Sequence, residues 1–189
     1  MCDMSNALPL DGSHIDIITI LEADHRAATA LLARVEGAAP EERAAPFLEL
    51  LRFLVAHEMA EEQVLYPALR VVTNQTEPMI QQRLEEQREA EDLLRRLEEA
   101  DPSSPELGSL FGRLRQAVRA HAEAEELEVL PLLAELEQAL DRPGMGARYV
   151  EAKRRAPTHP HPDAPDRPPG NLVAGPLVGL VDRVRDAFR

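Results

Sequence analysis

The chain is poor in aromatic residues and in cysteine, and both scarcities limit what it can be. Its 189 residues include no tryptophan, two tyrosines, four phenylalanines and a single cysteine, Cys2. A core must therefore be built from leucine, isoleucine, valine and alanine. One cysteine excludes an internal disulfide bond and is typical of proteins in a reducing compartment, so we predict a cytoplasmic location.

Long apolar runs and positive charge are scarce as well. No stretch is long and apolar enough to span a bilayer, and the first residues lack the basic start and apolar run of a secretory signal. Acidic residues outnumber basic ones by 34 to 21, which gives a net charge of −13. An acidic surface repels the phosphate backbone, so we expect no nucleic-acid partner. Most carboxylates, such as Glu85, Glu86, Glu98 and Glu99, are predicted to form a solvated face.

A short motif occurs twice, 64 residues apart. Each copy has a histidine followed by a glutamate after four residues and by a proline after ten; the histidines are His57 and His121, and the glutamates are Glu61 and Glu125. Four residues make about one helical turn, so each histidine shares a helix face with its glutamate. Apolar residues at helical spacing on either side predict that this face is buried.

Carboxylates on a buried face point to a cation. Burying a carboxylate is costly unless it is paired, hydrogen-bonded or bound to a metal, and two facing carboxylates also repel each other. A single pair at this spacing is more often an exposed contact, but the doubled motif on apolar stripes favours metal ligands. His25 lies on a further apolar stripe with Ile18, Leu21 and Leu32. Alone it would be read as a core histidine; as one of three it is a predicted ligand.

The repeat extends over a helical hairpin. Asp24-His25-Arg26 resembles Glu86-Gln87-Arg88 at an offset of 62 residues, so each half has a helix followed by a ligand helix. The predicted helices cover residues 14–36, 42–71, 77–100 and 105–140. No stretch alternates apolar and polar residues as a strand would. The fold is therefore predicted to be all-α, an antiparallel up-down four-helix bundle with its metal site inside.

Three segments are predicted: a leader at 1–13, the bundle at 14–142 and an extension at 143–189. The extension has a short helix over 147–155 and a linker with seven prolines over 156–176, whose His159 and His161 are interpreted as exposed. Its last part is a short amphipathic helix. The apolar positions of this helix are Leu177, Leu180, Val181, Val184 and Phe188. Its few arginines are offset by aspartates, so we expect it to dock on the bundle or on a protein partner rather than on a membrane.

With these motifs the chain resembles the hemerythrin-like, HHE cation-binding family over about residues 14–140. The resemblance implies a non-haem di-iron site in which Glu61 and Glu125 bridge the metals and His25, His57 and His121 are terminal ligands. Members of this family bind dioxygen or nitric oxide, sense iron or oxygen, or handle peroxide. The implied cofactor is iron, and the implied partner is a small diatomic molecule or peroxide.

One position departs from the family pattern, because Gln87 stands where a histidine is expected. Amide oxygen is a weaker iron ligand than imidazole. Three outcomes stay open: a di-iron site completed by Glu91 or water, a site that holds one metal or binds the second weakly, or a degenerate bundle that serves as a non-catalytic scaffold. No catalytic residue is assigned. Tyr66 is nine residues from His57, which in a regular α-helix places it on the opposite face.

Overall fold

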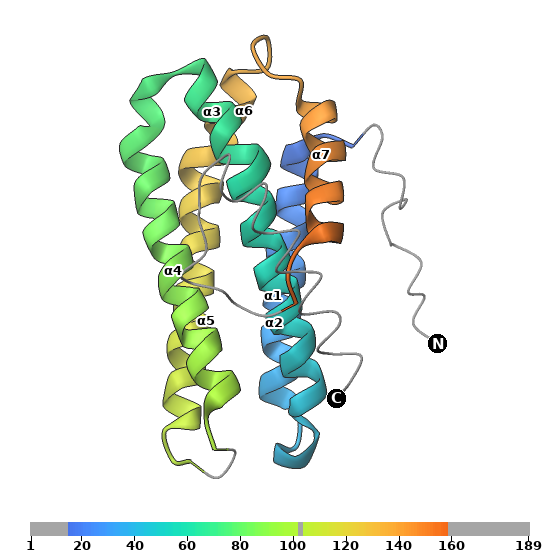
Figure 1. Ribbon diagram of the computed structural model, residues 1–189, viewed down its shortest axis with the longest axis vertical. Helices are drawn as coiled ribbons and strands as arrows, with labels where there is room; N and C mark the ends of the chain where they lie inside the picture. Colours follow the sequence, from blue (N-terminus) through green and yellow to red (C-terminus); the bar gives the residue numbers. More distant parts are fainter. Residues whose placement is uncertain (1–14, 102–103, 159–189) are drawn as a thin grey trace.

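The structure is a computed structural model that describes residues 15–101 and 104–158. Helices are the only regular secondary structure in this part of the chain, which confirms the predicted all-α class (Figure 1). The α-helices are α1 (Ile17–Gly37), α2 (Ala44–Ala60), α3 (Tyr66–Val72), α4 (Glu77–Glu99), α5 (Leu107–Ala124), α6 (Leu130–Glu135) and α7 (Arg142–Arg155). The short 3-10 helices η1 (Pro40–Glu42) and η3 (Asn74–Thr76) lie in the turns before α2 and α4.

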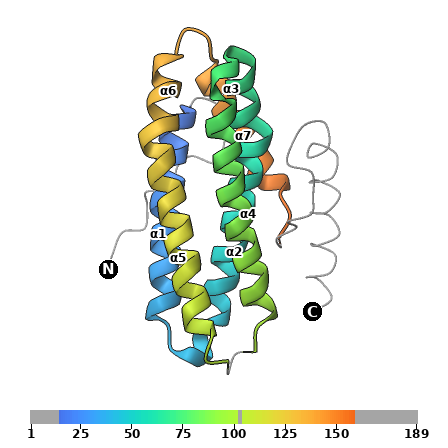
Figure 2. The same ribbon diagram turned by 90° about the vertical axis from the view of Figure 1, so that its left-hand side faces the viewer.

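The helices form two long hairpins that lie side by side. α1 packs on α2, and α4 packs on α5. Figures 1 and 2 show that the chain turns at alternating ends of the bundle, since α1 joins α2 at one end and α3 joins α4 at the other. In each hairpin, the second helix carries the histidine of one copy of the repeated motif. None of the described helices combines the length and the apolar character that a bilayer span requires.

Two apolar clusters fill the interior, and a belt of polar side chains lies between them along the four long helices. One cluster is built around Leu21, Leu65 and Tyr149, and the other around Leu32, Leu51 and Leu94. The belt consists of Asp24, His25, His57, Glu58, Glu61, Gln87, His121 and Glu125; Thr76 and Arg83 are also buried. Such burial is costly unless these groups find partners, so the belt is the natural place for a site.

Both helices that carry the repeated motif contain a π-helical turn where the motif ends. These turns are η2 (Glu61–Leu65) and η4 (Glu125–Val129), and after each of them the helix resumes as α3 or α6. The N–H of the next residue donates to the carbonyl of the glutamate five residues earlier. A proline follows each turn, at Pro67 and Pro131. A proline ring in a regular α-helix clashes with the carbonyl four residues earlier. We attribute the wider turns to these prolines.

Helix α7 begins five residues earlier than predicted and packs on α1, α2 and η2 (Figure 1). The Asp141 carboxylate accepts a hydrogen bond from the Gly144 N–H and so caps its first turn. Gly146 lies against the start of α1, where an added Cβ would be 2.1 Å from the Ile15 carbonyl oxygen. Glycine therefore permits this close approach. The predicted leader, the linker from residue 159 onward and the terminal amphipathic helix lie outside the described residues.

Candidate metal centre

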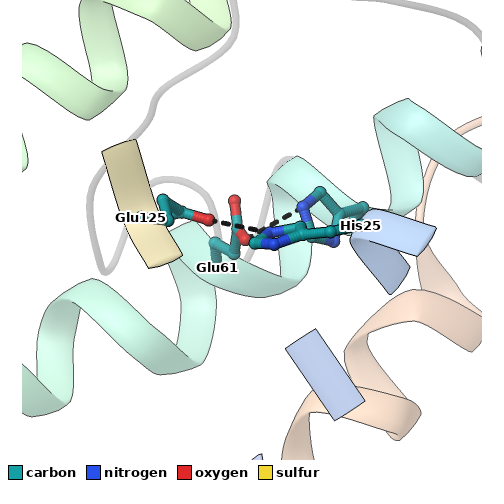
Figure 3. Close-up of side chains that lie close together, drawn as sticks. His25, Glu61 and Glu125 are labelled. Atoms are coloured by element: carbon teal, nitrogen blue, oxygen red, sulfur yellow. Dashed lines mark hydrogen bonds and ion pairs between the residues drawn. The ribbon is translucent and has the colours of Figure 1, made fainter. Parts of the chain in front are cut away.

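Four of the five predicted ligands converge in the polar belt. His25, His57, Glu61 and Glu125 are all buried, and each offers one ligand atom within 4.8 Å of the others. His25 comes from α1, His57 from α2, and the glutamates open η2 and η4. Figure 3 shows His25, Glu61 and Glu125 directed toward one another.

The Nε2 atoms of the three histidines face the two glutamates. His25 Nε2 is 3.3 Å from Glu125 Oε2, and His57 Nε2 is 3.0 Å from Glu61 Oε1. His121 is the fifth predicted ligand. Its Nε2 is 3.8 Å from an oxygen of Glu61 and 3.8 Å from an oxygen of Glu125. It therefore faces the same pair of carboxylates at slightly longer range.

On the outer side of His57, the ring meets a small polar network. His57 Nδ1 is 3.3 Å from Asp24 Oδ2 and 2.6 Å from the Tyr149 hydroxyl oxygen. Asp24 in turn accepts hydrogen bonds from the Tyr149 hydroxyl and from Lys153 Nζ. Tyr149 and Lys153 lie on α7, in the segment that the sequence analysis treated as an extension.

The other two histidines also have a carboxylate at Nδ1. His121 Nδ1 is 3.1 Å from Glu86 Oε2, and His25 Nδ1 is 3.0 Å from Glu126 Oε1. Glu86 accepts a further hydrogen bond from the buried Arg83 guanidinium. Glu86 was predicted to be solvated, but its side chain joins His121 to Arg83. Metal-bound histidines characteristically donate their second ring N–H to a carboxylate in this way.

The internal repeat contains a signal for two of these outer carboxylates. Asp24 and Glu86 occupy equivalent positions, each one residue before His25 or Gln87. The alignment of the two halves thus predicts an acidic residue at the same place beside each ring. Tyr149 on α7 gave no such signal.

Gln87 occupies the place of a ligand in the second half of the repeat. Its Nε2 donates to Glu61 Oε2 over 2.6 Å, just as His25 contacts Glu125. It also donates to the Tyr66 hydroxyl oxygen over 3.0 Å. Among the described residues, Glu91, the predicted substitute, is not part of the group of four converging ligands.

The expected orientation of Tyr66 is wrong. Its side chain is fully buried, and its hydroxyl donates to Glu125 Oε1 over 3.0 Å. The π-helical turn η2 has more residues per turn than an α-helix. It therefore changes the angle between His57 and Tyr66 and brings the tyrosine onto the face that carries His57 and Glu61. A regular period of 3.6 residues cannot anticipate such a shift.

Carboxylates raise the pKa values of the histidines. Burial alone would lower the pKa of His57, but the Glu61 charge and the hydrogen bond to Asp24 outweigh it and raise the pKa to about 10. For His121, burial is likewise outweighed, mainly by the charge of Glu125 and the closeness of the Glu61 carboxylate, and its pKa lies well above the ordinary value. Without metal, protons therefore occupy the nitrogen lone pairs that a cation would use.

The acidic partners respond in the opposite sense. Burial would raise the pKa of Glu61, but the His57 charge and the nearby His121 ring lower it. Burial likewise opposes ionisation of Asp24, and its contacts with His57 and Lys153 lower its pKa. Both carboxylates are thus held in the ionised form that binds cations.

A small cavity of about 20 Å³ adjoins the cluster. Its polar lining comes from His25, His57, Glu58, Gln87 and His121. Its apolar lining is Ala28, Leu54, Ala90, Val118 and Ala122. The volume suffices for one water-sized molecule.

Several buried polar atoms near this cavity have no hydrogen-bond partner. They include Glu58 Oε2, Gln87 Oε1 and His121 Nε2. Burial, and after it the charge of Glu91, raises the pKa of Glu58 well above its usual value. Native proteins seldom leave such groups unpaired, and a bound cation with its ligands would satisfy them. Nitrogen and carboxylate oxygen donors are also the set that first-row metals bind, so the residues fit a metal ion.

Comparisons with known proteins agree with this site. The model of the family described as hemerythrin HHE cation binding domain matches residues 16–133. An uncharacterised hemerythrin-like protein of Schizosaccharomyces pombe is 25% identical over 134 residues, which cover 70% of this chain and 66% of that protein. A DNA nickase of Nostoc sp. is 28% identical over 117 residues, covering 61% of this chain and 33% of the nickase. The chain thus spans less than two thirds of the length of either relative. No solved structure matches it.

Proposed function

Because the chain belongs to the hemerythrin family of HHE cation-binding domains, we propose that it binds iron in the polar belt and presents it to a small ligand. The proposed ligands of the metal are His25, His57, Glu61, His121 and Glu125. The proposed partner is dioxygen, nitric oxide or peroxide. One observation carries the proposal: three buried imidazoles turn Nε2 toward two buried glutamates, while each Nδ1 contacts another carboxylate.

The donor set supports iron. Imidazole and carboxylate together bind iron in its common oxidation states, whereas no thiolate is offered by the described residues of the site. A bound iron would supply reversible electron exchange and an open position for a diatomic molecule. The protein's part is to hold the imidazoles with Nε2 inward, to keep Glu61 ionised, and to exclude bulk water with the two leucine-rich clusters.

A second cation is proposed beside His121. Glu58 and His121 line the same cavity and each has an unpaired buried atom, and Glu61 and Glu125 are close enough to His121 to be shared. Glu58 is thus a better candidate than Glu91 to replace the ligand that Gln87 does not provide. The site is proposed to be di-iron, with the second position bound more weakly.

The cavity supports a small ligand rather than a larger substrate. It is about the size of one water molecule, and much of its lining is apolar. A diatomic molecule or peroxide that entered it would lie next to the proposed ligands His57 and His121. No catalytic residue is assigned, since turnover of such a ligand is a separate question from binding it.

We also propose a domain division and a location. The two hairpins form an antiparallel up-down four-helix bundle to which α7 is added, so the structural unit covers about residues 15–158 rather than 14–142. The cytoplasmic location and the absence of a nucleic-acid partner stay predictions from cysteine content and charge. A metal-free scaffold would leave the buried atoms near Glu58 and His121 unsatisfied, which disfavours that alternative.

The experiment is anaerobic loading of the metal-free full-length chain with iron(II). Iron per chain is measured after desalting, and absorption spectra are recorded before and after exposure to dioxygen or nitric oxide. We expect up to two irons per chain and a near-ultraviolet band that responds to the gas. A chain that retains no iron under these conditions would contradict the proposal.

Histidine variants separate the site from other iron-binding groups. Alanine at His57 or His121 is expected to abolish most retention. Alanine at His159 or His161, the matched changes outside the described residues, is expected to leave it unchanged. Equal losses at both pairs of positions would show that iron is held elsewhere.

A further inference from the structure

Helix α7 reaches the surroundings of His57 from beyond the region that matches the family. The match ends at residue 133, and α7 begins at Arg142. Tyr149 and Lys153 are four residues apart and therefore lie on the same face of α7. The Tyr149 ring is fully buried, and the Lys153 side chain is mostly so. Both side chains contact Asp24, which contacts His57.

The hydrogen bonds of Tyr149 have a defined direction. Its hydroxyl has one proton, which is donated to Asp24 Oδ2 over 3.0 Å. The hydroxyl oxygen is then available as an acceptor, and His57 Nδ1 lies 2.6 Å from it. Asp24 Oδ2 is farther from Nδ1, at 3.3 Å. Tyr149 is therefore the nearer acceptor for a proton on Nδ1, and Asp24 holds Tyr149 in the orientation that accepts it.

Lys153 and Phe53 complete the enclosure of the ring. Lys153 Nζ is 2.5 Å from Asp24 Oδ2 and lies over the Phe53 ring, 4.5 Å from its centroid. Phe53 stacks on the His57 ring with 12° between the planes. The ammonium keeps Asp24 an acceptor, and the stacked ring limits rotation of the imidazole. The Nδ1 edge of His57 thus faces Tyr149, and its Nε2 edge faces Glu61. Phe53 lies against the face of the ring.

We propose that Tyr149 and Lys153 are positioning residues for His57, so that α7 is a functional part of the metal centre. Tyr149 accepts the Nδ1 proton and thereby fixes the tautomer whose Nε2 lone pair faces the metal. Lys153 fixes Asp24, and through it Tyr149. The inference rests on the proposed function, because it assumes that His57 binds a metal.

In the other half of the repeat, the Nδ1 atom of His121 has a supporting carboxylate without any contribution from α7. Glu86 contacts His121 Nδ1 and is held by Arg83, three residues earlier on α4. No described residue of α7 contacts that pair through a hydrogen bond or ion pair. The contribution of α7 is therefore specific to the half that contains His57.

The test compares Tyr149→Phe with wild type in the full-length chain. Iron(II) affinity is measured anaerobically by competition with a chromogenic chelator, and the His57 Nδ1–H resonance is recorded by NMR in metal-free protein. Loss of a supporting contact to a metal-bound histidine costs about 10- to 100-fold in affinity. We expect the lower end, about tenfold, because Asp24 stays within reach of Nδ1. We also expect the Nδ1–H resonance to shift or disappear through exchange with water.

Met145→Leu is the matched control, because Met145 is buried on α7 and belongs to the apolar cluster around Leu21. It should leave both readouts unchanged. Lys153→Met keeps the aliphatic stem and removes the charge, and should weaken iron binding in the same direction as Tyr149→Phe. It replaces Tyr149→Phe as the test if that variant does not fold.

The outcomes separate the two proposals. If wild-type protein binds no iron(II), the proposed function fails. If wild type binds iron(II) but Tyr149→Phe and Lys153→Met bind it equally well, with the His57 resonance unmoved, only the role of α7 is overturned. If Met145→Leu weakens binding as much as Tyr149→Phe, packing of α7 rather than the hydroxyl explains the effect, and the inference is also overturned.

Discussion

At the scale of single residues, the candidate metal centre is distinguished by the groups that contact the outer nitrogen of each predicted histidine ligand. His25, His57 and His121 each have a carboxylate at Nδ1, from Glu126, Asp24 and Glu86 respectively. Such a carboxylate fixes the tautomer and makes the imidazole a better donor to a metal. The predicted ligands themselves were found from spacing, because one helical turn separates histidine from glutamate. Their outer partners come from neighbouring helices, and spacing within one helix says little about them.

Gln87→His should raise the number of irons retained per chain. Gln87 contacts Glu61 just as His25 contacts Glu125, so a histidine there would supply an imidazole where the chain now offers an amide. Iron per chain after chelator challenge is the measurement. Gln116→His, at an exposed position on α5, is the matched control and should change nothing. Lower iron retention in a folded Gln87→His protein would contradict the assignment of this position.

Glu86→Gln should weaken iron binding by about 10- to 100-fold, because it removes the charge that supports His121 Nδ1. The side chain keeps its length, so packing is little disturbed. Chelator competition measures the change. Its neighbour Glu85 is exposed, and Glu85→Gln should bind iron as wild type does. Equal iron affinity of the two variants would show that Glu86 does not support His121.

At the scale of elements, the π-helical turns and the docking of α7 are the features that the sequence does not predict. The prediction of four long helices was close, since apolar periodicity marks buried faces well. Each ligand helix, however, contains one wide turn, and the turn in η2 brings Tyr66 onto the site. A fixed period of 3.6 residues cannot represent this. The role of α7 was missed because the contact partners of Tyr149 are about 90 to 125 residues away in the chain.

Gly146→Ala should destabilise the protein by about 1–3 kcal/mol, the usual cost of overpacking. The new Cβ would lie 2.1 Å from the Ile15 carbonyl oxygen and 3.1 Å from the Ile20 side chain, so α7 would have to move away from α1. Urea denaturation measures the free energy of unfolding. We also expect weaker iron binding, because Tyr149 would move with the helix.

Gly112 provides the comparison for this change. It lies on α5, and an added Cβ would meet nothing within 4 Å. Gly112→Ala should therefore stabilise the protein by roughly 0.5–1 kcal/mol, the ordinary helix preference for alanine. A Gly146→Ala protein as stable as Gly112→Ala would show that the close approach of α7 to α1 is not required.

At the scale of the whole molecule, the bundle concentrates ionisable groups where most proteins place hydrocarbon. Glu61 and Glu125 are fully buried between two leucine-rich clusters, with imidazoles beside them. The all-α class could be predicted, because an amphipathic pattern and short connections leave few alternatives. How far the bundle continues along the chain could not, because a helix with weak amphipathicity such as α7 gives no sign of where it docks.

Stability of the metal-free protein should fall as pH rises from 6.5 to about 10. The pKa of His57 is raised from its ordinary 6.5 to about 10 in the folded state, so the folded chain binds this proton more tightly than the unfolded chain. The stabilisation is complete below pH 6.5 and is lost as pH passes the folded pKa. His25 and His121 are shifted in the same direction and add to the slope.

Urea denaturation at several pH values with a chelator present measures this slope. His57→Gln should flatten it, and iron(II) under anaerobic conditions should do the same, because the metal then replaces the protons. A metal-free protein that is more stable at pH 9 than at pH 6 would contradict the electrostatic account.

The tandem construction has a practical consequence, because a molecule built twice can be compared with itself. Asp24 and Glu86 are counterparts, as are Glu61 and Glu125. When the same kind of substitution is made at two counterpart positions, subtracting one effect from the other removes the contribution that both hairpins share. The remaining difference measures what distinguishes the two hairpins. One hairpin has the imidazole of His25 where the other has the amide of Gln87. The first is contacted by α7, whereas in the second Arg83 holds the outer carboxylate.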